Sequence, residues 1–198
     1  MSQNKKTLFS VKDIALIGMM TAMLEAVKIA LQAVPNVELV TLLIILFTLY
    51  LGWKTLLAVW AFVGIECVVW GIGLWTIMYV YVWPILVLLT LLIRKKNAYL
   101  RYCFLSGFFG LFFGAFCSIP YFFIGGPSMA VSWWISGIPY DILHGISNFV
   151  LCLILFPALR KVQKGRSFCP DTGVKTPTYV RPLYQKLIFL YHLFYILL

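Results

Sequence analysis

The segment from Ile138 to Asn148 holds the densest set of polar side chains in an otherwise apolar chain. Asp141, His144 and Asn148 fall within about 60° of one another if this segment is a helix. A lone histidine in such a helix usually has a structural role. A carboxylate, an imidazole and an amide on one face can instead hydrogen-bond a ligand. The stripe therefore predicts a small-molecule pocket, with helix packing as the alternative.

Other polar groups could converge on the same place. Glu66 lies in an apolar segment, and Asn36 and Glu38 follow Pro35 in a short connection. Asn36 is better interpreted as the cap of the next helix, with Glu38 facing the helix dipole. Aromatic residues gather near the same end of the predicted spans, where an interfacial belt accounts for about half of them. The remaining pocket candidates are Trp70, Trp75, Tyr79, Trp133 and Trp134.

The first apolar segment contains a charged pair and a ladder of small residues. Glu25 and Lys28 stand three residues apart, and we expect them to pair, either structurally or in a pocket, because isolated charges are costly in lipid. Small residues recur every four positions on another side of this helix, which allows another helix to approach closely. The ladder either packs within the bundle or docks a partner; it consists of Gly18, Ala22, Ala26 and Ala30.

Signatures of catalysis and of metal or cofactor binding are missing from the sequence. It has no HExxH, GxSxG or P-loop motif, and its five cysteines form no CxxC pair. We therefore expect no enzyme activity, no metal and no cofactor. A chain without a nucleotide site also needs a partner or an ion gradient to move anything uphill. The alternative from another class is a membrane-embedded enzyme that uses His144 with Asp141, and a third is a non-transporting assembly subunit.

The elements that must position these residues are apolar helices. Of the 198 residues, 63% are hydrophobic, which excludes an ordinary water-soluble domain. About 20 apolar residues cross a bilayer as a helix. We predict an all-α, polytopic six-helix transmembrane domain over residues 1–164, and a linker with a short apolar tail of unknown role over 165–198. The predicted spans are 13–33, 38–53, 55–71, 76–93, 101–120 and 138–158.

The charge distribution predicts the orientation of these spans. Basic residues cluster before the first span, between the fourth and fifth, and after the sixth, while the loops on the opposite side contain no Lys or Arg. The positive-inside rule then places both ends of the six-helix core in the cytoplasm of a cell-membrane protein. The net charge of +10 is explained by topology, and no basic stripe with exposed aromatics predicts nucleic-acid binding.

The stretch from Pro120 to Pro139 is unusual among the connections. Its glycines and prolines argue against a helix, and its apolar side chains argue against a solvated loop. Irregular backbone at membrane depth is tolerated when it is buried in protein or lines a cavity. We therefore predict an irregular lid over an outward-facing pocket.

These features together resemble the substrate-binding S component of energy-coupling factor (ECF) transporters. The resemblance covers about residues 10–163. It rests on six short spans with inside ends, the small-residue ladder, the Pro35–Val40 stretch, and the lid followed by residues 137–149. The family implies a vitamin or related micronutrient bound near the outer face. It also implies a complex with a transmembrane coupling protein and two ATP-binding subunits, which form an ATP-driven uptake system.

Two details of the resemblance concern particular residues. The family's Ala-xxx-Ala docking motif maps onto Ala22 and Ala26, and the neighbouring Glu25 and Lys28 depart from the pattern. The tryptophans suit stacking on a flat heterocycle. The outer loops contain no Lys or Arg to bind a strongly anionic ligand.

Overall fold

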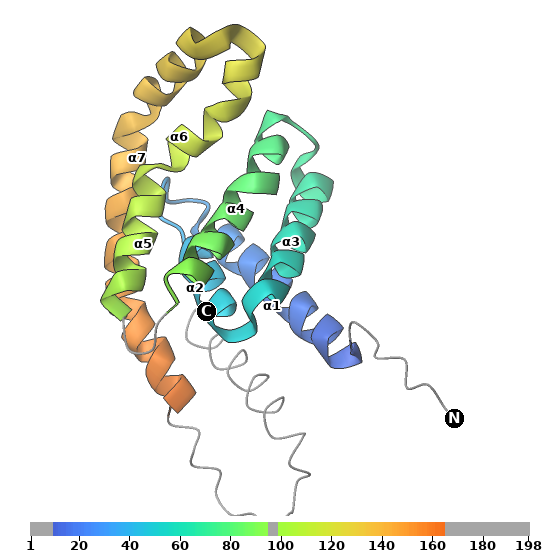
Figure 1. Cartoon of the computed structure of the whole chain (residues 1–198). Helices are drawn as coiled ribbons and strands as arrows, with labels where there is room; N and C mark the ends of the chain where they lie inside the picture. Colours follow the sequence, from blue (N-terminus) through green and yellow to red (C-terminus); the bar gives the residue numbers. More distant parts are fainter. Residues whose placement is uncertain (1–9, 95–98, 165–198) are drawn as a thin grey trace, which may run out of the picture.

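The computed structural model describes residues 10–94 and 99–164, all of them in helices or short connections (Figure 1). The N-terminal Lys5–Lys6 pair and the 165–198 tail lie outside these residues. The elements are α1 (Val11–Leu31), α2 (Val40–Leu51), a short 3₁₀ turn η1 (Gly52–Lys54), α3 (Thr55–Trp70), α4 (Leu74–Leu92), α5 (Tyr99–Leu111), α6 (Phe113–Cys117) and α7 (Ile119–Lys164).

Four stretches of the described residues are long and apolar enough to cross a membrane. They are Val11–Leu31, Val40–Trp70, Leu74–Leu92 and Ile119–Pro157. The chain is therefore a multi-span helical membrane protein. Six separate crossings go beyond this finding, because α2 has 12 residues and α5 has 13. At 1.5 Å per residue each is only about 20 Å long.

The short α2 helix forms the centre of the core. Every side chain from Val40 to Thr48 is buried, and α2 contacts α1, α3, α4, α5 and α7. A helix surrounded by protein on all sides need not match the thickness of the hydrocarbon layer. The predicted turn after α2 is confirmed: Gly52 adopts φ 60°, which only glycine takes up readily, and α3 then returns beside α2.

The predicted irregular lid is wrong. Residues 119–164 are helical except at Gly125 and Gly126, where the chain reverses at the top of a long hairpin formed by α5, α6 and α7 (Figure 1). Pro127 directly follows this break and so lies in the first turn of the descending helix, where a missing N–H costs nothing. Pro139 lies inside α7. The last predicted span therefore starts about eleven residues too late (counting from Pro127).

Glycines allow the two arms of this hairpin to approach closely. A Cβ added to Gly110 would stand 2.9 Å from the backbone of Gly145, and one added to Gly145 would stand 3.0 Å from the carbonyl oxygen of Gly107. A Cβ on Gly114 would overlap the carboxylate of Asp141. The hairpin therefore depends on small residues at the α5–α7 contact.

We expect Gly110→Ala to lower the free energy of unfolding by about 1–3 kcal/mol, because the methyl group overpacks this contact. The matched control is Gly64→Ala in α3, where an added Cβ meets nothing within 4 Å and helix propensity favours alanine. Unfolding of both variants by SDS titration in detergent micelles is the measurement. Equal losses in the two variants would contradict the close packing.

The start of α1, the turn η1 and the end of α4 lie at the lower end of the bundle in Figure 1. Lys54 Nζ lies 2.7 Å from Asp13 Oδ1, and Arg94 donates a hydrogen bond of 2.9 Å to the carbonyl oxygen of Leu49. These contacts tie the start of α1, the turn η1 and the ends of α2 and α4 together. We call the opposite end, which carries the α3–α4 turn and the Gly125–Gly126 break, the upper end.

Candidate functional site

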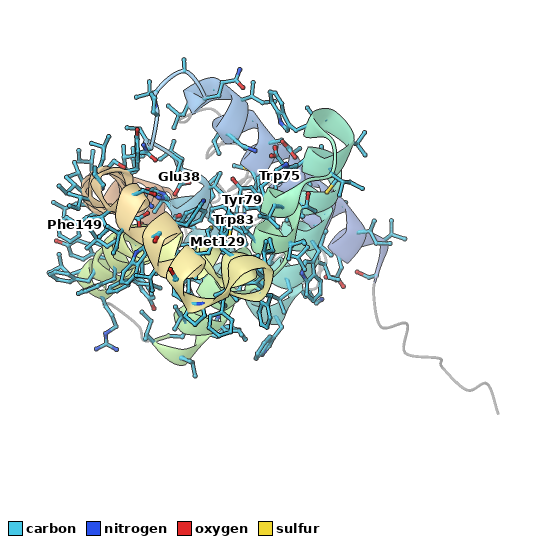
Figure 2. All side chains as sticks on the ribbon, turned by 90° about the horizontal axis from the view of Figure 1, so that it is seen from above. Glu38, Trp75, Tyr79, Trp83, Met129 and Phe149 are labelled. Atoms are coloured by element: carbon cyan, nitrogen blue, oxygen red, sulfur yellow. The ribbon has the colours of Figure 1, made fainter. Side chains whose placement is uncertain are left out.

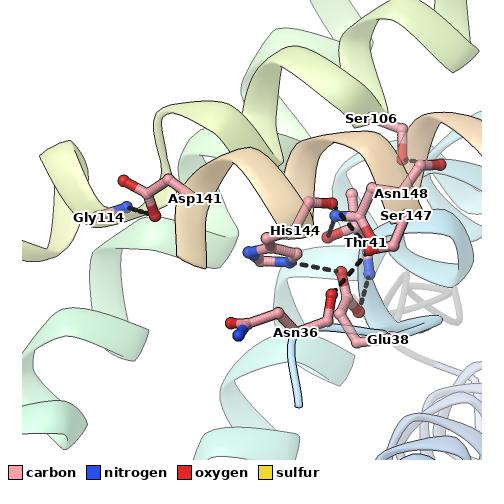
Figure 3. A network of polar contacts seen from close by, with 9 residues as sticks. All are labelled: Asn36, Glu38, Thr41, Ser106, Gly114, Asp141, His144, Ser147 and Asn148. Carbon is pink, nitrogen blue, oxygen red and sulfur yellow. Dashed lines mark hydrogen bonds and ion pairs between the residues drawn. The ribbon is translucent and has the colours of Figure 1, made fainter. Parts of the chain in front are cut away.

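The polar residues of α7 contact three other elements (Figure 3). His144 Nε2 lies 3.2 Å from Glu38 Oε1, and Asn148 donates a hydrogen bond of 3.3 Å to Thr41 Oγ1. Asp141 Oδ1 accepts a hydrogen bond of 3.0 Å from the backbone N–H of Gly114. All three α7 side chains are buried. They share one face of the helix, as the spacing predicts, and each has a different partner.

The α1–α2 connection is fastened to this face. Ser147 donates a hydrogen bond of 2.7 Å to the carbonyl oxygen of Asn36, whose φ of 59° makes the turn. The predicted cap is wrong: the N–H of Thr41 donates to Glu38 Oε2 at 2.9 Å, so Glu38 caps α2 instead of Asn36. The reason is position, because α2 begins at Val40 and Asn36 lies four residues before it, whereas Glu38 is three residues from Thr41.

Glu38 therefore has two roles in the network. Burial disfavours its charge, but its hydrogen bond to His144, the charge of that imidazole and the bonds from Thr41 outweigh this effect. The pKa of Glu38 is consequently held below its ordinary value. The contacts of the fold thus favour the ionised form of this carboxyl group.

Three buried polar atoms along α7 have no hydrogen-bond partner among the described residues. They are Trp134 Nε1, Asp141 Oδ2 and Asn148 Oδ1, spaced seven residues apart along one stripe. The indole N–H of Trp134 interacts with the Asp141 carboxylate as a hydrogen-bond donor of poor geometry, outside the usual limits of distance and angle. Because buried polar groups are almost always satisfied, an unsatisfied stripe of this kind is unusual.

A ladder of aromatic rings on α4 faces the Glu38 region. Trp75 meets Tyr79 and Tyr79 meets Trp83 in edge-to-face contacts, each with 5.5 Å between ring centroids (Figure 2). Trp83 also contacts Phe113 of α6, and its indole nitrogen is buried without a partner. These aromatic groups and the polar stripe of α7 lie on different elements around the same part of the molecule.

The other predicted tryptophans lie differently. Trp133 stacks on Tyr121 across the hairpin, with 4.8 Å between ring centroids. Trp70 is 58% exposed at the end of α3, which suits a membrane-interface position better than a pocket.

A second charged cluster joins α1, α3 and α4. Lys28 forms its ion pair with Glu66, which is 1% exposed, and the expected partner Glu25 interacts with Lys28 only electrostatically, without a direct contact. The Lys28 ammonium also lies 5.9 Å from the ring centre of Phe62 and 5.6 Å from that of Tyr79. Glu25 Oε1 is buried without a hydrogen-bond partner, as is Glu66 Oε1.

The two charged regions approach each other at Tyr79. Its ring faces Lys28, and its hydroxyl lies within electrostatic range of Glu38. Glu66 therefore lies beside Lys28 and Tyr79 and makes no hydrogen bond to the described polar stripe of α7.

The small-residue ladder of α1 faces outward. Gly18, Ala22 and Ala30 are exposed and Ala26 is half-buried, and nothing lies within 4 Å of a Cβ added to Gly18. The ladder therefore does not pack against another helix within the described part of the bundle.

Comparison with known proteins identifies no relative. No protein-family model matches the chain, and no curated protein or solved structure is significantly similar to it. A functional interpretation therefore depends on the chemistry of the site.

The contacts of His144 and Ser147 are defined by the structure. His144 contacts Glu38, whereas the alternative of a membrane-embedded enzyme pairs it with Asp141, and the nearby hydroxyl of Ser147 donates to backbone oxygens of Asn36 and His144. No group of three or more metal-ligating side chains is found in the part of the chain that the structure describes.

Sequence reasoning missed several residues of the network. Thr41, Ser106 and Gly114 all bond α7 or its partners, and Ser106 donates to the carbonyl oxygen of Asn148 at 3.3 Å. The signal for Gly114 was present in the sequence, because Gly107, Gly110 and Gly114 recur along one face of a predicted helix. Thr41 and Ser106 carry no such signal.

Proposed function

We propose that this protein is the substrate-specific membrane subunit of an ECF-type transporter. It binds a vitamin or related micronutrient at the upper end of the bundle, without enzymatic chemistry of its own. The observation that carries the proposal is the stripe of unpartnered polar atoms at Trp134, Asp141 and Asn148. In lipid such atoms are costly, and a hydrogen-bonding ligand would satisfy them.

The aromatic ladder supports the same proposal. Trp75, Tyr79 and Trp83 offer rings to a flat heterocycle, and Trp83 adds an unpartnered N–H. The test is native mass spectrometry of the full chain, purified gently in detergent. We expect a small organic molecule to remain bound. A protein that never carries or binds any small molecule would contradict the proposal and favour an assembly subunit.

The outward-facing ladder of α1 supports the proposal that this protein docks to a partner membrane protein. An exposed row of small residues allows a second membrane helix to pack closely, so we propose this face as the docking surface for the coupling protein, which in turn holds two ATP-binding subunits.

We expect the double variant Ala22→Trp and Ala26→Trp to abolish co-purification with a coupling protein, because the indoles fill the space that the partner helix needs. The matched control is Val68→Trp on α3, which is also exposed, at 87%, but carries no small-residue ladder. Co-expression followed by affinity pull-down is the measurement. A complex that survives the double variant, or is lost equally in the control, would remove α1 as the docking surface.

We further propose that the lower, basic end of the bundle lies in the cytoplasm. With the native cysteines replaced, Ile72→Cys at the upper end should react with an impermeant maleimide in intact cells, since this side chain is 86% exposed. Arg94→Cys should react only after the cells are permeabilised. The opposite labelling pattern would reverse the orientation.

A further inference from the structure

The two polar clusters around Lys28 and Glu38 contain more carboxyl groups than cationic groups. Four of the five carboxyl groups among the described residues belong to these clusters: Glu25, Glu38, Glu66 and Asp141. Lys28 is the ammonium group that faces them, and His144 is the imidazole. The four carboxyl groups outnumber the two groups that can carry a positive charge, and neither Glu25 nor Asp141 forms an ion pair among the described residues. A cation bound beside these two carboxyl groups would stabilise their ionised form.

The buried polar atoms without a hydrogen-bond partner also favour a ligand that donates hydrogen bonds. Four of them accept hydrogen bonds: Glu25 Oε1, Glu66 Oε1, Asp141 Oδ2 and Asn148 Oδ1. The indole nitrogens of Trp83 and Trp134 are donors. Glu66, Asp141 and Asn148 are each more than nine-tenths buried, so water does not readily satisfy them. A complementary molecule must mainly donate hydrogen bonds.

The Lys28 cluster shows how acidic and aromatic side chains of this site contact a cation. Its ammonium is held by the carboxylate of Glu66 and by the faces of Phe62 and Tyr79, which is the combination that recognises organic ammonium groups. Tyr79 continues this surface toward Glu38. Metal ions prefer several oxygen, nitrogen or sulfur ligands, and no such group of three occurs among the described residues.

We infer that the molecule bound at the upper end is an organic cation with an aromatic ring and hydrogen-bond donors. This inference rests on the proposed function, and it narrows the substrate class by charge. The carboxylates and acceptor atoms recognise the positive, donating part, and the rings of α4 contact the flat part.

The first test is the identity of the molecule found by native mass spectrometry. If the protein is purified empty, the probes are 1-methylnicotinamide, nicotinamide and nicotinate, which share a ring and carry charges of about +1, 0 and −1 at pH 7. Binding to the full chain in detergent is measured by titration calorimetry. We expect the cation to bind at least about tenfold more tightly than the neutral probe, and the anion more weakly still.

A variant tests whether the carboxylates cause this preference. Glu25→Gln removes a charge whose carboxylate Oε1 has no hydrogen-bond partner, so the fold should be retained. We expect the preference for the cation to fall by about threefold or more. Asp13→Asn at the lower end is the control and should leave the preference unchanged.

The outcomes separate the two proposals. A bound molecule or probe series that favours a neutral or anionic compound overturns the cation inference but leaves the substrate-binding function standing. An unchanged preference in Glu25→Gln overturns the role of the Lys28 cluster and with it the inference. A protein that carries no molecule and binds none of the three probes overturns both.

Discussion

Lys28→Met is expected to lower the free energy of unfolding by about 3 kcal/mol, among the largest effects on stability that we predict. The reason is that Glu66 is 1% exposed and would lose its ionic partner while remaining inside the bundle. Such a carboxylate must be buried uncompensated or take up a proton, and either process costs free energy. The measurement is reversible unfolding by SDS titration in mixed micelles.

The chain offers a matched control for this variant. Lys54 also pairs with a carboxylate, but its side chain is 42% exposed and that of Asp13 is 20% exposed. Lys54→Met should therefore cost less than about 1 kcal/mol. The double variant Lys28→Met with Glu66→Gln should recover much of the loss, because no charge is left alone. Equal losses at Lys28 and Lys54 would show that the Lys28–Glu66 pair is not buried in the folded protein.

Asp141→Asn is expected to weaken ligand binding by about 5- to 150-fold with little loss of stability. The variant keeps Oδ1, which accepts from the N–H of Gly114, and replaces the unpartnered Oδ2 by an amide donor. A ligand group that donates to Oδ2 would then face another donor. Titration calorimetry with the molecule identified by mass spectrometry, beside a thermal melt, measures both properties.

Ser106→Ala provides the comparison for Asp141→Asn. It removes a buried hydrogen bond to the carbonyl oxygen of Asn148 but leaves the unpartnered stripe intact. It should therefore lower stability by about 1 kcal/mol and leave affinity nearly unchanged. If Asp141→Asn binds the ligand as well as the wild type does, the stripe serves helix packing and the pocket must be sought around Glu25 and Glu66.

Local sequence patterns predicted the features that depend on a single local property, such as the length of an apolar stretch or the spacing of polar residues along a helix. Apolar length located α1, α3 and α4 to within a few residues, and helical spacing placed Asp141, His144 and Asn148 on one face. The turn at Gly52–Lys54 followed from the break between two apolar stretches, and the structure shows Gly52 there with a positive φ. Each of these features depends only on neighbouring residues.

Features set by distant contacts could not be predicted in this way. Glu38 and His144 are 106 residues apart in the chain, and nothing local identifies them as partners. Lys28 has a carboxylate one turn away in Glu25, yet it pairs with Glu66, because helix packing brings α3 closer. Glycine and proline near residues 120–139 were interpreted as helix breakers, whereas only Gly125 and Gly126 interrupt the helix.

The unbroken part of α7 gives the molecule a mechanical property. From Pro127 to Lys164 it is a single helical rod, about 57 Å long at 1.5 Å per residue. A rod of that length acts as a lever: tilting it by about 5° displaces one end by about 5 Å relative to the other. His144 and Asn148 connect this lever to the α1–α2 region through Glu38 and Thr41. Any tilt of α7 about these contacts would therefore move its far ends by more than it moves the side chains that make the contacts.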